Sequence, residues 1–370
     1  MIDGAKRILV LGLGGAGCST IAKIAPDAPR GMQFSVMDCD VQTLETCSHI
    51  ESRFDVGKGI TDGMSAGGDL EVGRRCIEQS TSQLETLFAG IDLLMVVTGL
   101  GGGFGSGAAP VVARLARNAG AHTLFFTIFP FKFEGAVVRA KAHNSLRRLR
   151  THADAIVQLP NSRIQPEGDE LLSDSLERSS QTLAAGVVGI WRLLTQTGGV
   201  CNLDIATLHT MLRHCDATCR FACACADGQD RAEDLVQALR AHPLAEEGDV
   251  FKAAPGLIVG ITGGDDLKLS EVRHILEAVS PESDESWVRM GVASDSTYTG
   301  KICAIILAAE SWKDPLVDGV DPALPATGQG ELVGVLRPRS KTFGGSERTI
   351  LKGEDLDVPT YLRRKIKLPR

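Results

Sequence analysis

The stretch that decides the fold is Gly99-Leu100-Gly101-Gly102-Gly103-Phe104-Gly105-Ser106-Gly107. It follows the apolar run Leu93-Leu94-Met95-Val96-Val97 and precedes a helical pattern at 108–118, so it joins a strand to a helix. Successive backbone N–H groups in such a loop form a concave anion site, and a nest this long is suited to wrapping a di- or triphosphate. The stretch therefore predicts a nucleotide phosphate site.

A second glycine loop lies near the N-terminus. Gly12-Leu13-Gly14-Gly15-Ala16-Gly17 follows the apolar run Ile8-Leu9-Val10-Leu11 and leads into a helix from Ser19. Backbone N–H groups and a helix N-terminus favour phosphate here as well. By itself this motif also fits a tight structural turn, or a nicotinamide dehydrogenase with Asp38 or Asp40 as the ribose-binding acid. A dehydrogenase has no need for the longer loop at 99–107, so the two loops together favour a nucleotide with several phosphates.

Apolar runs alternate with helical patterns through the first part of the chain. Further strand candidates lie at 34–37, 122–128 and 155–159. Such alternation predicts a mostly parallel sheet covered by helices on both faces. Residues 171–195 carry apolar residues at helical spacing without a proline, which predicts one long helix. Strand candidates at 257–262, 287–292 and 302–307 then predict a second α/β domain.

The composition is that of an ordinary globular protein. The 370 residues are 43% hydrophobic and 23% charged, and the net charge of −7 gives no basic excess for non-specific nucleic-acid binding. No apolar stretch reaches the ~18 residues of a spanning helix. Residues 1–7 are too short and polar to predict a signal peptide.

The ten cysteines lie within apolar patterns, and we interpret them as reduced, cytosolic thiols. The tightest group is Cys215, Cys219, Cys223 and Cys225, whose spacing fits no standard zinc knuckle. Because residues 220–226 alternate small or apolar side chains, a buried strand with thiols as small hydrophobes is favoured over a zinc site. We therefore predict no resident metal centre.

The end of the chain has a different composition. From about residue 313 to 354 it is rich in Pro, Gly, Ser and charge with weak periodicity, which is typical of a flexible linker. Residues 355–370 mix apolar and basic residues and are too few to fold alone. They are suited to docking on a partner, although a merely solubilising end is the alternative.

The loop at 99–107 closely resembles the signature loop of the tubulin and FtsZ family. The loop at 12–17 resembles that family's first phosphate loop, and Gly63-Met64-Ser65-Ala66-Gly67-Gly68 resembles the loop that senses the terminal phosphate. The segment 38–44 resembles its acidic loop, and 130–135 its ribose-side loop. Asn202-Leu203-Asp204-Ile205-Ala206 is similar to the synergy loop, which enters the neighbouring subunit's site. The resemblance covers about 7–311 and the tail.

This resemblance implies a tubulin/FtsZ-like α/β fold. A Rossmann-like nucleotide-binding domain at 1–170 would be joined by a long central helix at 171–197 to a second, activation domain at 198–312. A linker at 313–354 and a partner-binding peptide at 355–370 would follow. It also implies a protein that binds GTP and GDP with Mg²⁺, hydrolyses GTP, and polymerises head to tail into filaments for bacterial cell division. The expected location is the cytoplasm at the division site.

The resemblance also assigns site residues. Asp204 and Asn202 would act on the neighbouring subunit's nucleotide, with Asp204 orienting water, although Asp204 could instead simply cap the following helix. The peptide would bind a membrane adaptor, and its basic end could add about 1 kcal/mol per charge near anionic lipid. The predicted adaptor-binding residues are Asp357, Pro359, Tyr361, Leu362 and Arg363. The predicted nucleotide-binding residues are Gly14, Gly15, Ala16, Gly17, Cys18, Ala66, Gly67, Gly68, Gly101, Gly102, Gly103, Phe104, Gly105, Ser106, Gly107, Glu134 and Asn161.

The chain departs from the family pattern inside the site. Phe104 replaces a Thr hydroxyl, and its ring would pack either on the subunit interface or under the loop. Thr207 replaces an acidic residue of the synergy loop, and losing a water-positioning carboxylate costs ~10²–10⁴ in rate. Val138, with Arg139 beside it, stands at the phosphate-side Arg position, and Gln181 at that of the base-reading Asp. Two interpretations remain: a weak GTPase, or a non-hydrolysing structural paralogue that joins filaments, including those of an orthodox FtsZ.

Overall fold

The computed structural model describes residues 6–161, 172–195, 203, 205, 207, 208, 210, 218–283, 286–309, 350, 351, 354 and 355. Met1–Val320 form one compact unit and Asp321–Arg370 a second. In the second unit, β11 (Ile350–Leu351) pairs antiparallel with β12 (Glu354–Asp355). The predicted adaptor-binding residues lie outside the described residues, as does most of the predicted linker; they are Asp357, Pro359, Tyr361, Leu362 and Arg363.

The first half of the main unit is a parallel sheet. Its strand order is β3-β2-β1-β4-β5-β6, and every neighbouring pair is parallel. The order reverses between β1 and β4, which leaves a crevice outside the carboxyl ends of the strands. The strands are β1 (Ile8–Leu13), β2 (Gln33–Asp38), β3 (Ser52–Asp55), β4 (Leu93–Gly99), β5 (His122–Phe129) and β6 (Ala155–Pro160).

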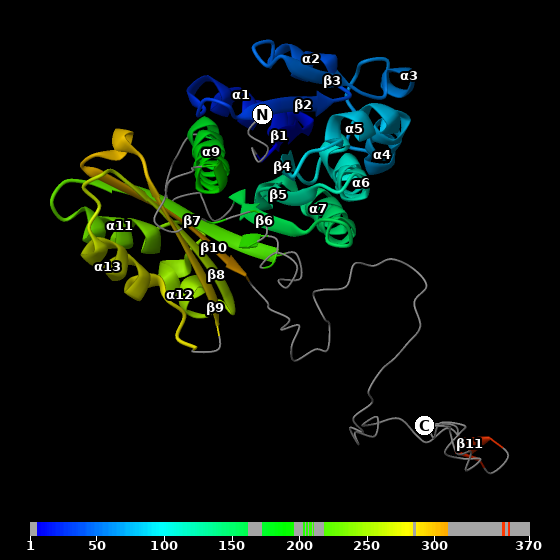
Figure 1. Cartoon of the computed structure of the whole chain (residues 1–370). Coiled ribbons are helices and arrows are strands. Elements are labelled where there is room, and N and C mark those ends of the chain that lie inside the picture. The colour runs from blue at the N-terminus through cyan, green and yellow to red at the C-terminus, as the bar shows by residue number, and fades with distance from the viewer. Residues whose placement is uncertain are drawn as a thin grey trace, which may run out of the picture. The chain divides into compact units, whose positions relative to one another are not determined.

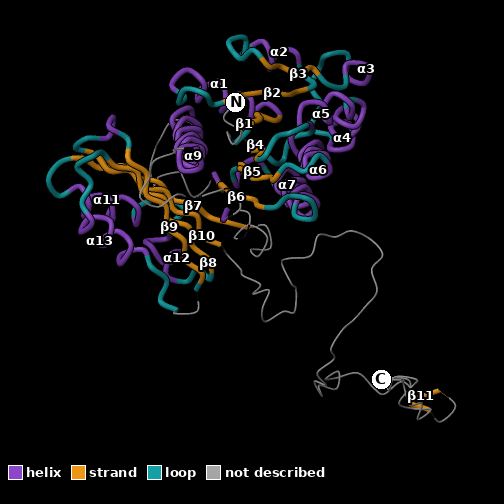
Figure 2. Tube along the Cα trace, in the orientation of Figure 1, coloured by secondary structure: helices purple, strands orange, loops and turns teal. Residues whose placement is uncertain are grey.

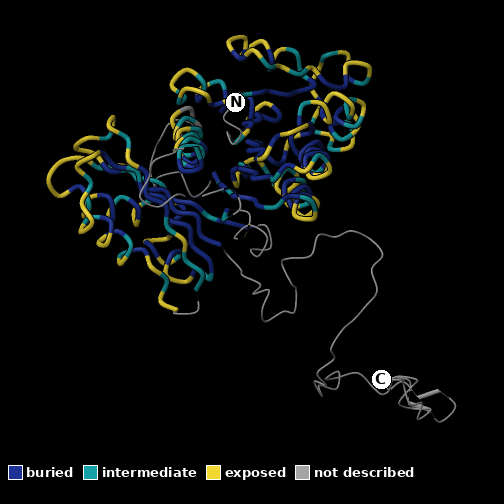
Figure 3. The backbone as a smooth tube through the Cα atoms, viewed as in Figure 1, coloured by how far each residue is buried: buried dark blue, intermediate teal, exposed yellow. Residues whose placement is uncertain are grey.

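Helices cover both faces of this sheet (Figure 1). α1 and α9 pack on one face, and α4, α5, α6 and α7 on the other, each face with its own apolar core. All six residues of β1 are buried because both of its faces are covered, as Figure 3 shows. The helices are α1 (Gly14–Ile24), η1 (Ala25–Asp27), α2 (Val41–Glu45), α3 (Lys58–Thr61), α4 (Leu70–Gln79), α5 (Thr81–Phe88), α6 (Phe104–Asn118), η2 (Lys132–Glu134) and α7 (Ala136–Leu149).

The long helix α9 (Leu172–Thr195) lies between the two halves of the main unit (Figure 2). It buries Leu183, Val187 and Ile190 in a core shared by both halves. The sheet also continues across the boundary, because β6 pairs in parallel with β7 (Thr218–Asp227). One sheet of ten strands therefore runs through the main unit, in the order β3-β2-β1-β4-β5-β6-β7-β10-β8-β9.

The second half of the sheet is mixed. β10 pairs antiparallel with both β7 and β8, and β9 pairs in parallel with β8. The buried Arg231 of α11 ties this layer together through 2.7 Å ion pairs with Asp266 and Glu271. The remaining elements are α11 (Arg231–Arg240), η3 (Glu246–Gly248), α12 (Asp249–Lys252), β8 (Gly256–Gly263), α13 (Leu269–Val279), β9 (Trp287–Ser294), η4 (Ser296–Tyr298) and β10 (Lys301–Ala309).

The predicted α/β architecture is confirmed. The predicted strands appear with ends extended by one or two residues, and the predicted helix at 171–195 appears as α9. The edge strand β3 was not predicted, because Ser52–Asp55 alternate exposure and carry no apolar run. The proposed domain boundaries remain a prediction. No helix among the described residues has both the length and the apolar composition to cross a bilayer.

One prediction about the cysteines is wrong. Cys225 and Cys303 form a disulfide, whereas we expected reduced thiols throughout. The antiparallel register of β7 and β10 places the two residues directly opposite each other, with their Cα atoms 4.0 Å apart. Their separation of 78 residues in sequence gave no signal of this pairing. Cys219 is buried and Cys223 is half-buried in β7, in keeping with the strand interpretation.

Helix α6 contains Pro110, which has no N–H for the carbonyl of Ser106 one turn earlier. Ser145 of α7 supplies the missing donor, because its Oγ donates to the Ser106 carbonyl at 2.6 Å. Both serines are buried, so this carbonyl cannot turn to water instead. The bond therefore joins α7 to the first turn of α6.

We expect Ser145→Ala to lower the free energy of unfolding by about 1–3 kcal/mol, because it leaves a buried carbonyl without a donor. Pro110→Ala restores an N–H in α6, so in that background the same substitution should cost less than about 0.5 kcal/mol. Urea unfolding of the four proteins in this cycle measures the difference. Equal costs in the two backgrounds would show that the Ser106 carbonyl does not depend on Ser145.

Candidate functional site

A cleft of about 980 Å³ opens at the carboxyl ends of the parallel strands, where the strand order reverses. Its volume lies at the upper end of the range for small-molecule sites. Residues following β1, β4, β5 and β6 line it, and one side is closed by the first turns of α9. Both predicted glycine loops therefore face one hollow.

Bare backbone forms one end of this cleft. Gly15, Gly67 and Gly102 all line it, and a Cβ added to any of them would meet no atom within 4 Å. They come from three separate loops, so a ligand can approach main-chain atoms from three directions. Convergent backbone of this kind fits a group with several negatively charged oxygens, such as a chain of phosphates.

The three loops also touch one another. A Cβ at Gly103 would lie 2.9 Å from the Ala66 Cβ and from the Asp69 nitrogen. A Cβ at Gly99 would lie 2.8 Å from the Ala16 Cβ. These separations are shorter than real Cβ contacts, so the loops can meet this closely only with glycine at both positions.

The predicted nucleotide-binding residues fall into two groups. Twelve line the cleft: Gly14, Gly15, Ala16, Ala66, Gly67, Gly68, Gly102, Gly103, Phe104, Gly105, Glu134 and Asn161. The other five are buried behind its wall and do not line it: Gly17, Cys18, Gly101, Ser106 and Gly107.

The residues behind the wall hold the loops in place. Gly17 lets α1 approach β4, since a Cβ there would lie 2.1 Å from the Val97 carbonyl oxygen. Gly107 lets α6 approach α4, since a Cβ there would lie 2.1 Å from the Leu70 carbonyl oxygen. The Ser106 hydroxyl accepts a 2.7 Å hydrogen bond from the Gly101 N–H and so fixes the longer loop. The Cys18 thiol bonds backbone carbonyls of β1 and β2.

Phe104 packs under the first glycine loop. Its side chain is 5% exposed and belongs to the core between the sheet and α4–α7. A Cβ on Gly14 would lie 3.8 Å from the Phe104 ring. Of the two placements left open by the sequence, the structure therefore has the ring under the loop and not on an exposed surface.

The other end of the cleft holds more side chains. Glu134 is exposed there, and its carboxylate accepts a 2.7 Å hydrogen bond from the Phe131 N–H. The Phe131 ring stacks on Phe133, with centroids 4.8 Å apart. Asn161 is buried, and its side-chain oxygen accepts a 2.8 Å hydrogen bond from Ser179 of α9. A flat ring and hydroxyl groups would find apolar and polar partners here.

The acidic side chain that α9 brings to this end was not predicted. Gln181, the expected counterpart of the base-reading Asp, is exposed and does not line the cleft. Glu177, one turn earlier, does line it and forms an ion pair with Lys23 of α1. The Gln181 amide donates to the Glu177 carboxylate at 3.3 Å. Glu177 is thus the carboxylate of α9 best placed to meet a bound ligand.

The phosphate-side position is apolar. Val138 packs against the longer glycine loop, since a Cβ on Gly101 would lie 2.7 Å from the Val138 Cγ1. Arg139 is exposed and does not line the cleft. The structure therefore offers no guanidinium at this position among its described residues.

The predicted catalytic residues Asn202 and Asp204 lie outside the described residues. Their described neighbours Leu203, Ile205 and Leu208 are buried in the core that α9 shares with both halves. Leu203 packs on β9 of the second half, since a Cβ added to Gly291 would lie 2.7 Å from the Leu203 Cδ1. Thr207 is half-buried in the same segment.

Several cleft residues were not on the predicted list. Asp38 ends β2 and accepts hydrogen bonds from the Cys39 and Asp40 N–H groups at 2.7 and 3.2 Å. Burial raises the pKa of the Asp38 carboxyl. The acidic loop at 38–44 was the signal for it, and the one role considered for Asp38 was that of ribose-binding acid in the dehydrogenase alternative. Thr43, Ser65 and Phe131 also line the cleft; they lie in the loops at 38–44, 63–68 and 130–135 but were not on the predicted list. Ser19, Thr20, Lys23 and Ser179 line it as well, outside those loops. No metal-binding cluster of His, Cys, Asp or Glu occurs among the described residues.

Comparison with known proteins identifies two matching family models. The tubulin/FtsZ family GTPase domain matches residues 7–167, and the FtsZ family C-terminal domain matches residues 219–311. The two models together span most of the chain, one on each half of the sheet. They give no support to the dehydrogenase interpretation.

Solved structures agree with this assignment. A point mutant of FtsZ from M. jannaschii is 26% identical, with a TM-score of 0.74 over 83% of this chain and 91% of that one. An empty FtsZ dimer from the same organism is 24% identical, with a TM-score of 0.74 over 90% and 96%. CetZ2 from Haloferax volcanii, in a GTPγS-bound protofilament, is 20% identical, with a TM-score of 0.67 over 85% and 96%.

The sequence motifs, the shared cleft and the two family models lead to one assignment. The chain is a divergent, FtsZ-like member of the tubulin/FtsZ family and carries that family's GTPase domain.

Proposed function

We propose that the cleft binds GTP and GDP. The observation that carries this proposal is the convergence of Gly15, Gly67 and Gly102, with open space above each, at one end of the cleft. The phosphates, with associated Mg²⁺, would lie at this end. The ribose would lie near Glu134, and the base between Asn161 and the first turns of α9.

We further propose that the protein polymerises head to tail. Met64, Phe133 and Val137 lie on loops and a helix beside the cleft and are 67%, 66% and 69% exposed. Large exposed apolar side chains next to a polar cleft are typical of a surface that another protein covers. In such a filament Asp204 and Asn202 would complete the neighbour's site. The two contacting faces differ, so assembly would continue rather than close.

GTP turnover in this filament should be slow. Hydrolysis requires a positioned water and groups that take up charge on the terminal phosphate. Here Asp204 would have no second carboxylate beside it, since Thr207 stands in its place, and Val138 offers no charge. The Phe104 ring, packed under the loop, supplies no hydroxyl to the phosphates.

A second candidate function is a structural paralogue that does not hydrolyse GTP. Neither Gln181 nor Arg139 lines the cleft, which favours this second function. Gln181 therefore does not replace the base-reading Asp, and Arg139 does not replace the phosphate-side Arg. Such a chain would act through filament contacts, alone or within filaments of an orthodox FtsZ.

The cellular role we propose is bacterial cell division. The protein would act in the cytoplasm at the division site, where filaments form the septal ring. Residues 355–370 would dock on a membrane adaptor, in keeping with their mixture of apolar and basic residues.

Gly15→Glu should abolish nucleotide binding. The new carboxylate would stand in open space facing the phosphates, and its repulsion should weaken GTP and GDP binding at least about 100-fold. Gly15→Gln adds nearly the same volume without the charge and should bind much more tightly than Gly15→Glu. Isothermal titration calorimetry compares them. Equal losses in the two variants would contradict a phosphate site at this loop.

Asp204→Ala should lower GTP turnover without unfolding the chain, because the residue would act on the next subunit's nucleotide. An equal mixture with Gly15→Glu provides the sharper test. Each variant alone should be inactive, while the mixture should recover roughly a quarter of wild-type phosphate release, since random assembly makes that share of interfaces productive. A mixture that stays inactive would contradict a site shared between subunits.

Thr207→Asp should raise GTP turnover. A second carboxylate beside Asp204 would help to position water, and we expect at least a tenfold gain, within the ~10²–10⁴ that such a group supplies. Phosphate release across a protein concentration series measures the effect, with Thr207→Asn as the uncharged control. If Thr207→Asp stays as slow as the wild type, the missing carboxylate is not what limits the rate.

A further inference from the structure

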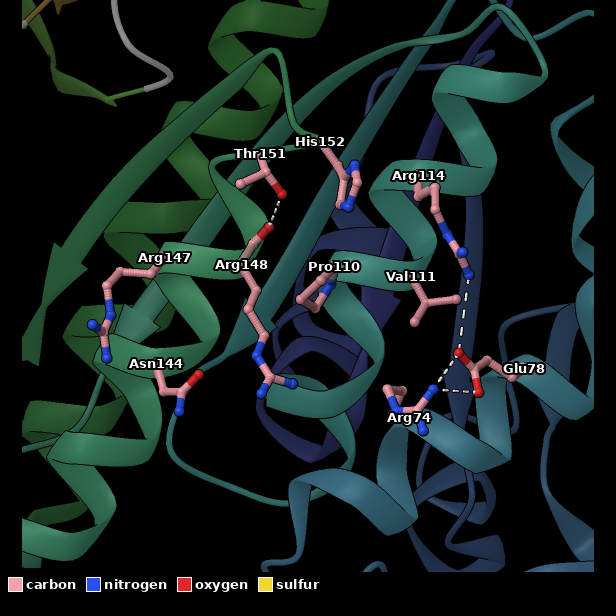
Figure 4. Close-up of a pocket in the computed structure, with 10 residues that line it drawn as sticks. All are labelled: Arg74, Glu78, Pro110, Val111, Arg114, Asn144, Arg147, Arg148, Thr151 and His152. Atoms are coloured by element: carbon pink, nitrogen blue, oxygen red, sulfur yellow. Dashed lines mark hydrogen bonds and ion pairs between the residues drawn. The ribbon is translucent and has the colours of Figure 1, made fainter. Parts of the chain in front are cut away.

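A second concave site is separate from the nucleotide cleft. It is a groove of about 580 Å³ formed by α4, α6, α7 and the turn that follows α7 (Figure 4). None of the residues that line it also lines the cleft described above. None of the motifs found in the sequence falls in it, so the family resemblance assigns it no role.

The groove is strongly basic. Four arginines line it against a single carboxylate, that of Glu78. Arg74 forms a 2.6 Å ion pair with Glu78, and Arg114 approaches the same carboxylate at 4.0 Å. Arg147 and Arg148 are exposed and form no ion pair among the described residues. This concentration of positive charge occurs in a chain whose net charge is −7.

The positive charge also affects the histidine in the groove. Burial, and then the cations Arg114 and Arg117, lower the pKa of His152 below its ordinary value. Like charges held this close destabilise the fold unless something compensates them. Glu71, which does not line the groove, also forms an ion pair with Arg74, and the bond to Arg74 and the charge of Arg148 lower the pKa of the Glu71 carboxyl. Glu78 and Glu71 thus supply two negative charges against four arginines, so the groove keeps an excess of positive charge.

Neutral groups complete the walls. Pro110 and Val111 of α6 form an apolar side, and Asn144 of α7 brings an amide into the groove. The Thr151 hydroxyl donates to the Arg148 carbonyl at 2.7 Å, which holds the turn after α7 against the helix. Arg148 is thus presented from a fixed helix end, across the groove from Arg74 of α4 (Figure 4).

We propose that this groove is a second anion site, which takes a phosphate-bearing ligand. A guanidinium matches phosphate oxygens with two parallel N–H bonds. A phosphate group carries up to two negative charges and three acceptor oxygens, so it can engage more than one arginine at once. A single carboxylate would compensate less of the charge. The ligand is either a free polyphosphate-like anion or a phospholipid headgroup, since both present the same chemistry.

The soluble arm of the test uses tripolyphosphate as the probe. The full chain is first saturated with GDP, which occupies the nucleotide cleft, and tripolyphosphate is then titrated by calorimetry. We expect saturable binding to the wild type and at least a tenfold loss of affinity in the double variant Arg147→Gln/Arg148→Gln. Losing one charge-assisted contact typically has an effect of this size.

A matched control separates the groove from general charge. Arg30 and Arg273 are exposed and lie far from the groove in sequence, on the turn after η1 and on α13. The double variant Arg30→Gln/Arg273→Gln loses the same net charge and should bind within about twofold of the wild type. Arg114→Gln, from a different helix, should weaken binding as well, which guards against a local defect in α7.

The lipid arm uses vesicles of phosphatidylglycerol and phosphatidylcholine, with phosphatidylcholine alone as the blank. All variants keep the basic residues of 355–370. If Arg147→Gln/Arg148→Gln co-sediments less than the wild type, the difference therefore reports on the groove alone. Binding of tripolyphosphate alone identifies a free anion as the ligand, and a loss seen only with vesicles identifies a headgroup. If the groove variant binds both probes like the wild type, or if the control loses as much, the proposal is overturned.

Discussion

The structure depends on the contact of three glycine loops at the point where the strand order reverses. Gly17 permits α1 to lie against β4, and Gly99 and Gly103 permit the longer loop to meet its two neighbours. Each of these approaches leaves room for a hydrogen atom only, so the contact is made by backbone rather than by side chains. Backbone brought together in this way leaves N–H groups for a ligand, which makes the cleft a direct result of the packing.

Much of this could be predicted from the sequence, because its strongest signals are local. Buried parallel strands appear as short apolar runs, and the loops at 12–17 and 99–107 each lie between such a run and a helix. The central helix was visible from its apolar spacing. The two loops together also favoured one nucleotide with several phosphates, and the structure brings both of them to one cleft.

The features that were missed depend on contacts between distant residues. Ser106 belongs to the signature loop, yet its hydroxyl holds Gly101, a use that only the geometry of α6 determines. Glu177 lines the cleft while Gln181 does not, because the orientation of α9 decides which of its side chains face the cleft. The disulfide depends on the register of two strands. The basic groove gathers arginines from three helices, and no spacing along the chain reveals it.

The junction between the two halves of the sheet has a mechanical consequence. Among the described residues, β6 and β7 pair at Ile156 with Thr218 and at Val157 with Cys219, whereas β10 and β7 pair at nine positions. The α9 core contacts both halves of the sheet, so it would carry part of any load that is pulled across this boundary. In the filament that we propose, strain would therefore pass through α9, from the half that holds the cleft to the half on which Leu203 packs.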